Sequence, residues 1–219
     1  MKNLEIYIHI PFCVRKCEYC DFLSFPADDD AKLRYVKGIM AEMIFYGPLM
    51  KNYQVSSVYI GGGTPSSIDE QWIAALMEGV FDCFNVLPDA EISIECNPGT
   101  LSREKLLAYR DAGINRLSIG LQSANNDELK LLGRIHTFEQ FVTNYEVARN
   151  VGFKNINVDL MYGLPGQSAS QYMATVNKII RLHPDHISAY SLIVEKGTPF
   201  YEKYKFDICL LYTSDAADE

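Results

Sequence analysis

The sequence predicts an α/β protein whose parallel sheet is built from repeated strand–helix units. Short segments rich in β-branched and aromatic residues alternate with longer segments of helical periodicity, and 48% of the 219 residues are hydrophobic. A chain of this length and composition can bury one sizeable core. Six strand–helix units can form part of an eight-stranded barrel or an open doubly wound sheet, and the pattern alone leaves both arrangements open.

The predicted strands are residues 4–9, 55–60, 91–95, 116–119, 155–160 and 186–191. The third strand is expected to stop before Pro98, because proline cannot donate a hydrogen bond to a neighbouring strand. In either fold a ligand lies at the carboxyl ends of the parallel strands. The loops that follow these strands are therefore the candidate functional regions.

Helices are expected between the strands, where apolar residues repeat at helical spacing. These residues are Leu33, Val36, Met40, Met43 and Ile44 in the first helical segment, and Phe138, Phe141, Val142 and Tyr145 in a later one. Three pairs match the capping-box pattern that starts a helix, namely Ser67 with Glu70, Thr137 with Gln140, and Ser168 with Gln171. Gly113 and Gly152 are expected to end helices, because glycine adopts a left-handed backbone most easily.

The charge balance and the absence of long apolar runs indicate which partners and compartments to expect. With 20 basic and 28 acidic residues the formal net charge is −8, which argues against a nucleic-acid partner held by phosphate contacts. The sequence has no apolar signal segment and no run of about eighteen apolar residues, so we expect a cytoplasmic protein. In that reducing compartment clustered cysteines stay free to bind metal, whereas Cys83 and Cys96 are expected to be buried as small hydrophobic residues.

Three cysteines, Cys13, Cys17 and Cys20, fall within eight residues directly after the first predicted strand. A short irregular loop can gather such thiolates around an iron–sulfur cluster, and three thiolates leave one iron of a four-iron cluster open to a small molecule. A zinc site is an alternative, for which His9 is the near candidate for a fourth ligand. A disulfide is disfavoured in a cytoplasmic protein.

The loops after the next two strands contain further candidates. Gly62, Gly63 and Thr64 follow the second strand, where exposed N–H groups can bind a carboxylate or a phosphate. A tight strand-to-helix turn explains these glycines equally well. Glu95 ends the third strand, where it can accept hydrogen bonds from a ribose or simply be a solvated carboxylate.

Polar side chains also follow the fourth and fifth strands. Arg134 can bind a carboxylate through two N–H groups, although an isolated arginine is usually a surface charge. Gln122 and Asp159 lie at the ends of strands and are individually explained by structural roles. Structural roles are also expected for the histidines, among which His136 is the strongest candidate for a ligand because it follows Arg134 closely.

The segment Tyr-Ile-His-Ile-Pro-Phe-Cys-x-x-x-Cys-x-x-Cys, residues 7–20, resembles the cluster loop of the radical S-adenosylmethionine (SAM) enzymes. More narrowly, it resembles the oxygen-independent coproporphyrinogen III oxidase family, which includes heme chaperones of the HemW type. The resemblance runs from about residue 7 to residue 204 and favours a partial (β/α)6 barrel, similar to part of a TIM barrel. It implies that Cys13, Cys17 and Cys20 hold a 4Fe–4S cluster whose open iron binds SAM. The SAM contacts that it implies are Tyr7, Tyr19, Gly62, Gly63, Thr64, Glu95, Gln122, Arg134 and Asp159.

Two departures from the oxidases resemble the heme chaperones. Phe22 stands where the oxidases carry an additional cysteine, and few residues precede Tyr7. The leading hypothesis is therefore a heme chaperone that delivers heme to acceptor proteins, which can be membrane-associated. The alternative is an oxidase that decarboxylates porphyrinogen propionates, or another radical SAM enzyme. Either role implies heme or a porphyrinogen as a partner, together with an electron donor such as a flavodoxin.

The resemblance also divides the chain. Residues 1–205 are predicted to be the radical SAM core domain, whereas residues 206–219 resemble no continuation of the family and are expected to be a disordered or artefactual tail. The heme-binding motif of the chaperones lies in a C-terminal domain that does not follow here, so heme binding is expected only when that domain is present.

Overall fold

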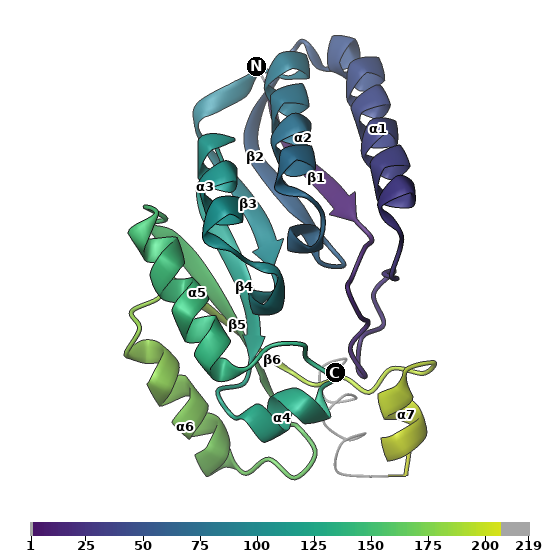
Figure 1. Ribbon diagram of the computed structural model, residues 1–219. Helices are drawn as coiled ribbons and strands as arrows, with labels where there is room; N and C mark the ends of the chain where they lie inside the picture. The colour runs from purple at the N-terminus through teal and green to yellow at the C-terminus, as the bar shows by residue number, and fades with distance from the viewer. Residues whose placement is uncertain (1, 207–219) are drawn as a thin grey trace.

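The computed structural model describes residues 2–206, which form a six-stranded sheet in the order β1-β2-β3-β4-β5-β6 (Figure 1). All five neighbouring pairs are parallel. The strands are β1 Lys2–Ile10, β2 Tyr53–Gly62, β3 Val86–Cys96, β4 Arg116–Gln122, β5 Asn155–Tyr162 and β6 His186–Ser191. Each predicted strand is present, and most extend by a few residues beyond the predicted range. The predicted tail lies outside the described residues except for Phe206.

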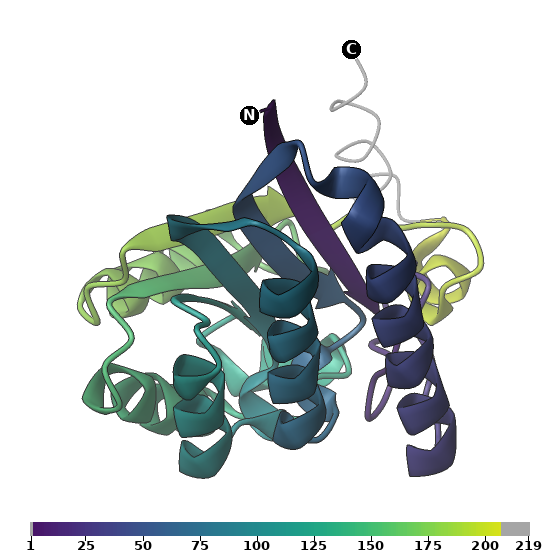
Figure 2. The same ribbon diagram turned by 90° about the horizontal axis from the view of Figure 1, so that it is seen from above.

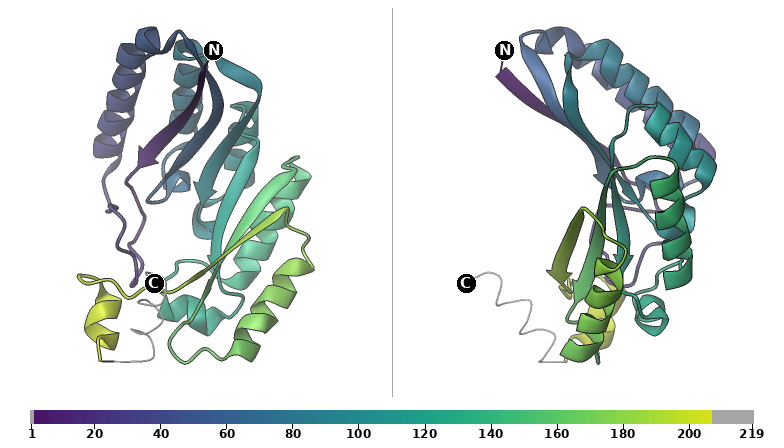
Figure 3. Two further views of the ribbon diagram at one scale, coloured as in Figure 1. Left: turned by 180° about the vertical axis from the view of Figure 1, so that it is seen from behind. Right: turned by 90° about the vertical axis from the view of Figure 1, so that its left-hand side faces the viewer.

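The helices that connect the strands cover one face of the curved sheet (Figures 2 and 3). They are α1 Asp29–Tyr46, α2 Glu70–Cys83, α3 Arg103–Asp111, α4 Asn126–Leu131, α5 Phe138–Asn150 and α6 Ala169–Ile180. Helix α7, Pro199–Tyr204, follows the last strand. A doubly wound sheet would reverse its strand order and carry helices on both faces. The sequential order and the single covered face instead give an open half-barrel, which confirms the predicted partial (β/α)6 barrel.

The two faces of the sheet differ sharply in polarity. Ile8, Ile60 and Ile94 are at most 3% exposed and pack in the main core between the sheet and the helices. Because side chains alternate along a strand, their neighbours point to the open, concave face. These neighbours include Tyr7, His9, Ser57, Tyr59, Glu91, Ser93, Glu95, Arg116, Ser118, Asn157, Asp159, His186, Ser188 and Tyr190. Closed barrels fill their interior with apolar layers, so this polar lining suits water or a polar ligand.

The helix boundaries test the predicted start and stop signals. Thr137 and Ser168 form capping boxes with Gln140 and Gln171, as predicted. The prediction for Ser67 was wrong, because α2 is capped by Asp69, whose side chain accepts a hydrogen bond from the Gln71 amide. Ser67 instead lies in the short 3-10 helix Pro65–Ser67 and donates to the carbonyl of Phe12.

The predicted ends of helices and strands are also visible. Gly113 and Gly152 follow α3 and α5 with φ of +89° and +108°, the left-handed conformation expected after a helix. Strand β3 ends at Cys96, and Pro98 begins a short 3-10 helix, as the proline predicted. Ile44 departs from the predicted core face of α1, since it is 67% exposed.

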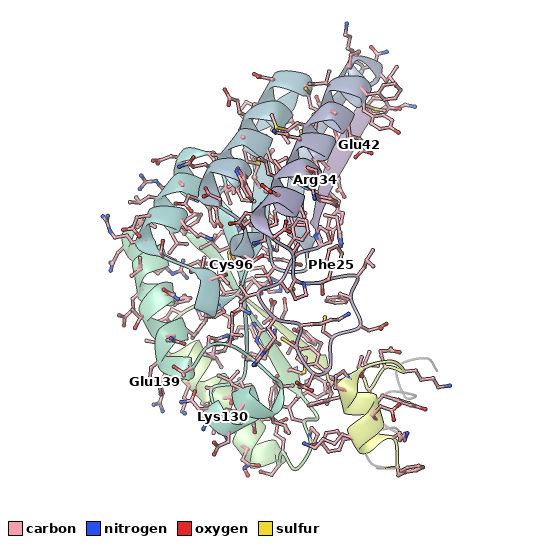
Figure 4. All side chains as sticks on the ribbon, turned by 45° about the vertical axis from the view of Figure 1, so that its right-hand side comes forward. Phe25, Arg34, Glu42, Cys96, Lys130 and Glu139 are labelled. Carbon is pink, nitrogen blue, oxygen red and sulfur yellow. The ribbon has the colours of Figure 1, made fainter. Side chains whose placement is uncertain are left out.

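The outer faces of the helices carry charged side chains together with some exposed apolar ones, such as Phe45 and Met173. Arg34 and Glu42 project from α1, Lys130 projects from α4 and Glu139 from α5 (Figure 4). Among the helices of residues 2–206, none combines the length and the apolar composition that crossing a bilayer requires.

A second, smaller hydrophobic core lies apart from the main one. Its buried members are Leu132, Met161, Leu164, Leu192, Val194 and Phe200, and Tyr19, Leu131, Tyr201 and Tyr204 pack against it. It joins the loops after β4 and β5 to the segment that follows β6. Tyr19 belongs to the cysteine segment, so this core reaches the part of the chain on which the functional prediction rests.

Candidate cofactor site

The three clustered cysteines lie on the loop that leaves the carboxyl end of β1, here called the cluster loop (residues 11–25). Phe25 closes the loop by pairing back to its start, since the Phe25 amide donates to the carbonyl of Pro11 and its carbonyl accepts from the amide of Cys13 (Figure 4). Cys17 and Cys20 are joined by a turn in which the Cys20 amide donates to the Cys17 carbonyl at 3.2 Å. All three thiols are free and partly exposed.

The zinc alternative receives no support from the position of His9. Its Nδ1 lies 3.0 Å from the hydroxyl of Tyr7 and its Nε2 lies 3.3 Å from the carbonyl of Leu23, so both ring nitrogens face other partners. Within residues 2–206, no three His, Cys, Asp or Glu side chains are arranged around one metal ion. In a 4Fe–4S cluster each cysteine binds a different iron, so the sulfurs surround a larger volume than a single ion occupies.

The glycine loop after β2 packs directly against the start of the cluster loop. The Gly63 amide donates to the carbonyl of Ile10 at 2.8 Å, and the Thr64 amide donates to the carbonyl of Phe12 at 2.7 Å. The Gly62 amide donates to Glu95, so all three N–H groups already have protein acceptors. The expectation that these N–H groups are exposed to bind an anion was therefore wrong. Any ligand group held here must be a donor, such as an ammonium, that uses carbonyl or hydroxyl oxygens.

Thr64 connects this loop to the first cysteine, with its Oγ1 3.4 Å from the Cys13 sulfur. A side chain at residue 63 would not fit, since a Cβ there would lie 2.8 Å from the carbonyl oxygen of Phe12 and 3.0 Å from its amide nitrogen. The glycine is needed because two backbone segments approach each other closely.

Glu95 lies in a polar, aromatic setting on the concave face. It accepts a hydrogen bond from the Tyr59 hydroxyl at 2.8 Å as well as the one from Gly62 at 3.1 Å. The rings of Tyr59 and Tyr7 are stacked, with centroids 6.2 Å apart, and Tyr7 is 58% exposed. Glu95 and Tyr7 are thus brought together, as the resemblance implied.

Arg134 lies at the second cysteine. Its Nη1 donates to the Cys17 sulfur at 3.4 Å, and its Nη2 donates to the carbonyl of Gly120 at 2.6 Å. Its Nε is buried and has no hydrogen-bond partner among residues 2–206. A buried cation with an unused donor indicates that an acceptor belongs nearby, since such groups are normally satisfied.

Gln122 lies next to this arginine at the end of β4. A Cβ on Gly120 would meet both the Gln122 amide nitrogen, at 3.1 Å, and the Arg134 guanidinium, at 3.2 Å. The Gln122 side chain accepts a hydrogen bond from the Tyr190 hydroxyl at 2.7 Å. Its φ of +75° is unusual for a residue other than glycine, and such strain is found mainly at functional positions.

Asp159 lies on β5 among neutral donors. Asn157 donates to it at 2.6 Å, and the Ser118 hydroxyl is 3.4 Å from both of its oxygens. Burial raises the pKa of Asp159 above its ordinary value, and it also raises the pKa of Glu95. The two carboxyl groups lie close enough on the concave face for each to disfavour ionisation of the other.

The histidines are accounted for by structural contacts. His136 is 4% exposed and lies between the Asn97 side-chain oxygen, at 3.1 Å, and the carbonyl of Leu121, at 3.3 Å. His186 contacts Arg116, and His183 lies at the turn before β6 with φ of +53°. His136 thus links the loops after β3 and β4 rather than projecting toward a ligand.

We expect the stability of the fold to fall in mild acid because of His136. Burial, and then the nearby Arg134 charge, lower the pKa of His136 to about 3. Between that value and the ordinary pKa near 6.5 the unfolded chain binds a proton that the folded chain does not, so stability decreases as pH falls. From pH 7 to pH 5 the free energy of unfolding should fall by about 1–2 kcal/mol more in the wild type than in His136→Gln. Urea unfolding at both pH values measures this, and equal pH dependence in the two proteins would contradict it.

Several contributors to the site were missed at the level of sequence. Tyr59, Asn157, Ser118 and Tyr190 all contact predicted site residues from the concave face. The alternation of polar and apolar residues along the strands was the available signal, because every second residue of these strands is polar. The hydrogen-bond partners themselves could not be read from that pattern.

Comparison with known proteins places this geometry in a family. The family model described as the radical SAM superfamily matches residues 7–179. The chain is 40% identical over 196 residues to "Heme chaperone HemW" of Bacillus subtilis, covering 89% of this chain and 52% of the relative. It is 38% identical over 203 residues to "Heme chaperone HemW" of Escherichia coli, covering 90% and 52%. The chain thus spans about half the length of these relatives.

A solved structure agrees with this result. Coproporphyrinogen III oxidase (HemN) from Escherichia coli, described as a radical SAM enzyme, superposes with a TM-score of 0.82 at 28% identity, over 97% of this chain and 53% of that one. The predicted family is confirmed, and the sequence relatives named above carry the name of the heme chaperones that Phe22 favoured. The chain belongs to the radical SAM superfamily.

Proposed function

We propose that this chain holds a 4Fe–4S cluster through Cys13, Cys17 and Cys20, binds SAM beside it, and serves as the core of a heme chaperone. The observation that supports this most strongly is the meeting of three cofactor loops at the cysteines. Thr64 of the glycine loop lies at Cys13, and Arg134 lies at Cys17. Solved structures that share this fold include one with a 4Fe–4S cluster bound and one bound to SAM.

The donor set fits the cluster. Thiolates are the ligands that iron–sulfur clusters use, and the turn from Cys17 to Cys20 holds the backbones of two of these cysteines close together. A cluster with three thiolates carries net negative charge, and the buried Arg134 guanidinium lies against one of the ligands to balance it. Its unpartnered Nε also leaves one donor available for a carboxylate oxygen of SAM or for a sulfide.

The concave face fits a zwitterionic nucleoside such as SAM. Carbonyls of the glycine loop can accept from an ammonium, and Glu95 can accept from a ribose. Tyr7 offers an exposed aromatic face, and Gln122 and Asp159 add polar groups on the opposite side. When bound together, cluster and SAM supply one-electron chemistry, and the protein's residues position them and exclude water.

The heme chaperone role is favoured over the oxidase role by the cluster loop. Phe22 occupies the place of the oxidases' additional cysteine and is 70% exposed. We further propose that residues 1–205 form the radical SAM core, that the protein works in the cytoplasm with an electron donor such as a flavodoxin, and that heme passes to an acceptor protein. Residues beyond this core, which make up the other half of the relatives' length, are proposed to complete the heme site.

Anaerobic reconstitution of the chain with iron and sulfide tests the cofactor proposal. The reconstituted protein should contain about four irons per chain, and addition of SAM should change the EPR spectrum of the reduced cluster. Uptake of zinc without iron or sulfide, or a spectrum that SAM leaves unchanged, would contradict it.

A second assay separates the two roles. The reconstituted protein is incubated with coproporphyrinogen, SAM and a reductant, and the chaperone role predicts that no protoporphyrinogen forms. Protoporphyrinogen formed in proportion to the SAM consumed would support the oxidase role instead.

A further inference from the structure

We propose that the segment after β6, residues 192–204, is the seat of the cluster loop, and that Phe200 is a positioning residue for the cluster ligands Cys17 and Cys20. This inference rests on the proposed function, since it concerns how the chain prepares its cysteines for a cluster. In Figure 1 the segment, coloured yellow, lies beside the purple cluster loop, although the two are at opposite ends of the described chain.

The backbone contacts define the seat. The residue between the second cysteine and Tyr19 is Glu18, and its amide donates to the carbonyl of Leu132 at 3.2 Å. Its carbonyl accepts from the amide of Phe200 at 3.0 Å. Both backbone polar groups of Glu18 are thus bonded to segments distant in the sequence, within a turn that its own hydrogen bond from Cys20 to Cys17 closes.

Side-chain packing strengthens this connection. Phe200 is 2% exposed, and its ring contacts Tyr19 edge-on with centroids 6.4 Å apart. Tyr19 lies between Cys17 and Cys20 in the sequence, and its side chain packs against this small core. Tyr19, two residues after Cys17 and one before Cys20, is therefore anchored by Phe200.

Gly133, in the loop after β4, packs closely against Glu18 of the cluster loop. Gly133 has φ of +73°, and a Cβ there would lie 3.0 Å from Cγ of Glu18 and 3.2 Å from its amide nitrogen. The Gly133 carbonyl accepts a hydrogen bond from Arg15 at 2.6 Å. The loop after β4 and the segment after β6 therefore hold the cluster loop from two sides.

These contacts point to positioning rather than to general stability. Phe200 belongs to the second core, which is separate from the main core that holds sheet and helices together. A cluster ligand that is already fixed loses little conformational entropy when the cluster binds, so preorganisation raises affinity. The superfamily match ends at residue 179, so the proposed seat lies beyond the region that the family model describes.

Hydrogen exchange in the cluster-free protein tests the seat without any cofactor. In Phe200→Ala the amide of Cys20 should exchange about tenfold faster than in the wild type, because the turn that it closes is no longer anchored, while amides of β3 keep their rates. Phe200→Leu should restore most of the protection, since it refills the pocket. Phe81→Ala is the matched control, because Phe81 is 46% exposed on α2 and far from the loop.

Cluster retention provides the second measurement. After reconstitution, Phe200→Ala should lose iron to a chelator about tenfold faster than the wild type, with Phe200→Leu close to the wild type. Unchanged Cys20 exchange in Phe200→Ala, or equal acceleration of all amides including those of β3, would overturn the proposal. If the wild type binds no iron, the proposed function fails, yet the exchange experiment still decides whether the seat exists.

Gly133→Ala gives an independent variant if Phe200→Ala does not fold. It leaves the second core intact and pushes directly against Glu18. The same local rise in Cys20 exchange is expected, and a rate equal to that of the wild type would contradict the claim that contacts of Glu18 hold this turn in place.

Discussion

Replacing Cys17 by alanine is expected to abolish iron–sulfur uptake by the reconstituted protein. Two remaining cysteines of the loop would hold the cluster too weakly, because each protein thiolate binds a separate iron. The Arg134 guanidinium would also lose the sulfur that it now contacts at 3.4 Å. Iron and acid-labile sulfide per chain should fall to the background of unreconstituted protein, and the same result is expected for Cys13→Ala and Cys20→Ala.

Cys83→Ala is the control for this series. Cys83 ends α2, is only partly buried, and lies outside the cluster loop, so its loss should leave iron content unchanged. Retention of a full cluster by Cys17→Ala would show that other groups hold the iron. The assignment of the three cysteines would then be wrong.

Gly63→Ala is expected to weaken SAM binding by at least tenfold while the sheet stays folded. The new Cβ would come within 2.8 Å of the Phe12 carbonyl oxygen, which is a backbone atom and cannot turn aside. The glycine loop must therefore move away from the cluster loop and lose the hydrogen bond from the Thr64 amide to Phe12. Equilibrium binding of SAM to the reconstituted variant measures the effect.

Gly38→Ala is the matched control, because a Cβ at this position on α1 meets no atom within 4 Å. It should bind SAM as the wild type does and gain up to about 1 kcal/mol in stability from the better helix propensity of alanine. Wild-type SAM affinity in Gly63→Ala would remove the glycine loop from the site.

The sheet could be predicted because its signal is local. In β4 and β5, buried residues such as Leu117 and Val158 alternate with polar residues that face the open side, and this pattern survives in any strand of the half-barrel. The start of α2 was placed wrongly because Ser67 and Asp69 can both cap a helix, and only Ser67 has an acidic residue, Glu70, three positions later. The choice between them depends on the Phe12 carbonyl, which binds Ser67 and which the local sequence does not reveal.

The candidate site could be predicted only as a set of motif residues, and its cofactor contacts stay a prediction. The structure brings the cysteines and Arg134 together, but the contact between Arg134 and Cys17 joins loops after β1 and β4, which the local sequence does not reveal. The sequence also did not reveal that protein groups accept the hydrogen bonds of the Gly62, Gly63 and Thr64 amides. These bonds form because segments from the ends of β1, β2 and β3 lie close together. The role of Phe200 had no sequence signal, because it arises from packing between the two ends of the chain.

The strand order of the sheet has a consequence for how the molecule is made. Each strand pairs with the strand synthesised just before it. A chain emerging from the ribosome can therefore extend the sheet by one strand–helix unit at a time, and no late strand has to insert between earlier ones. The cysteines leave the ribosome among the first residues, yet Phe200, which anchors Tyr19, leaves it among the last of the described chain. On the proposal that Phe200 positions the cluster ligands, the cysteines become preorganised only after the segment that follows β6 has been synthesised.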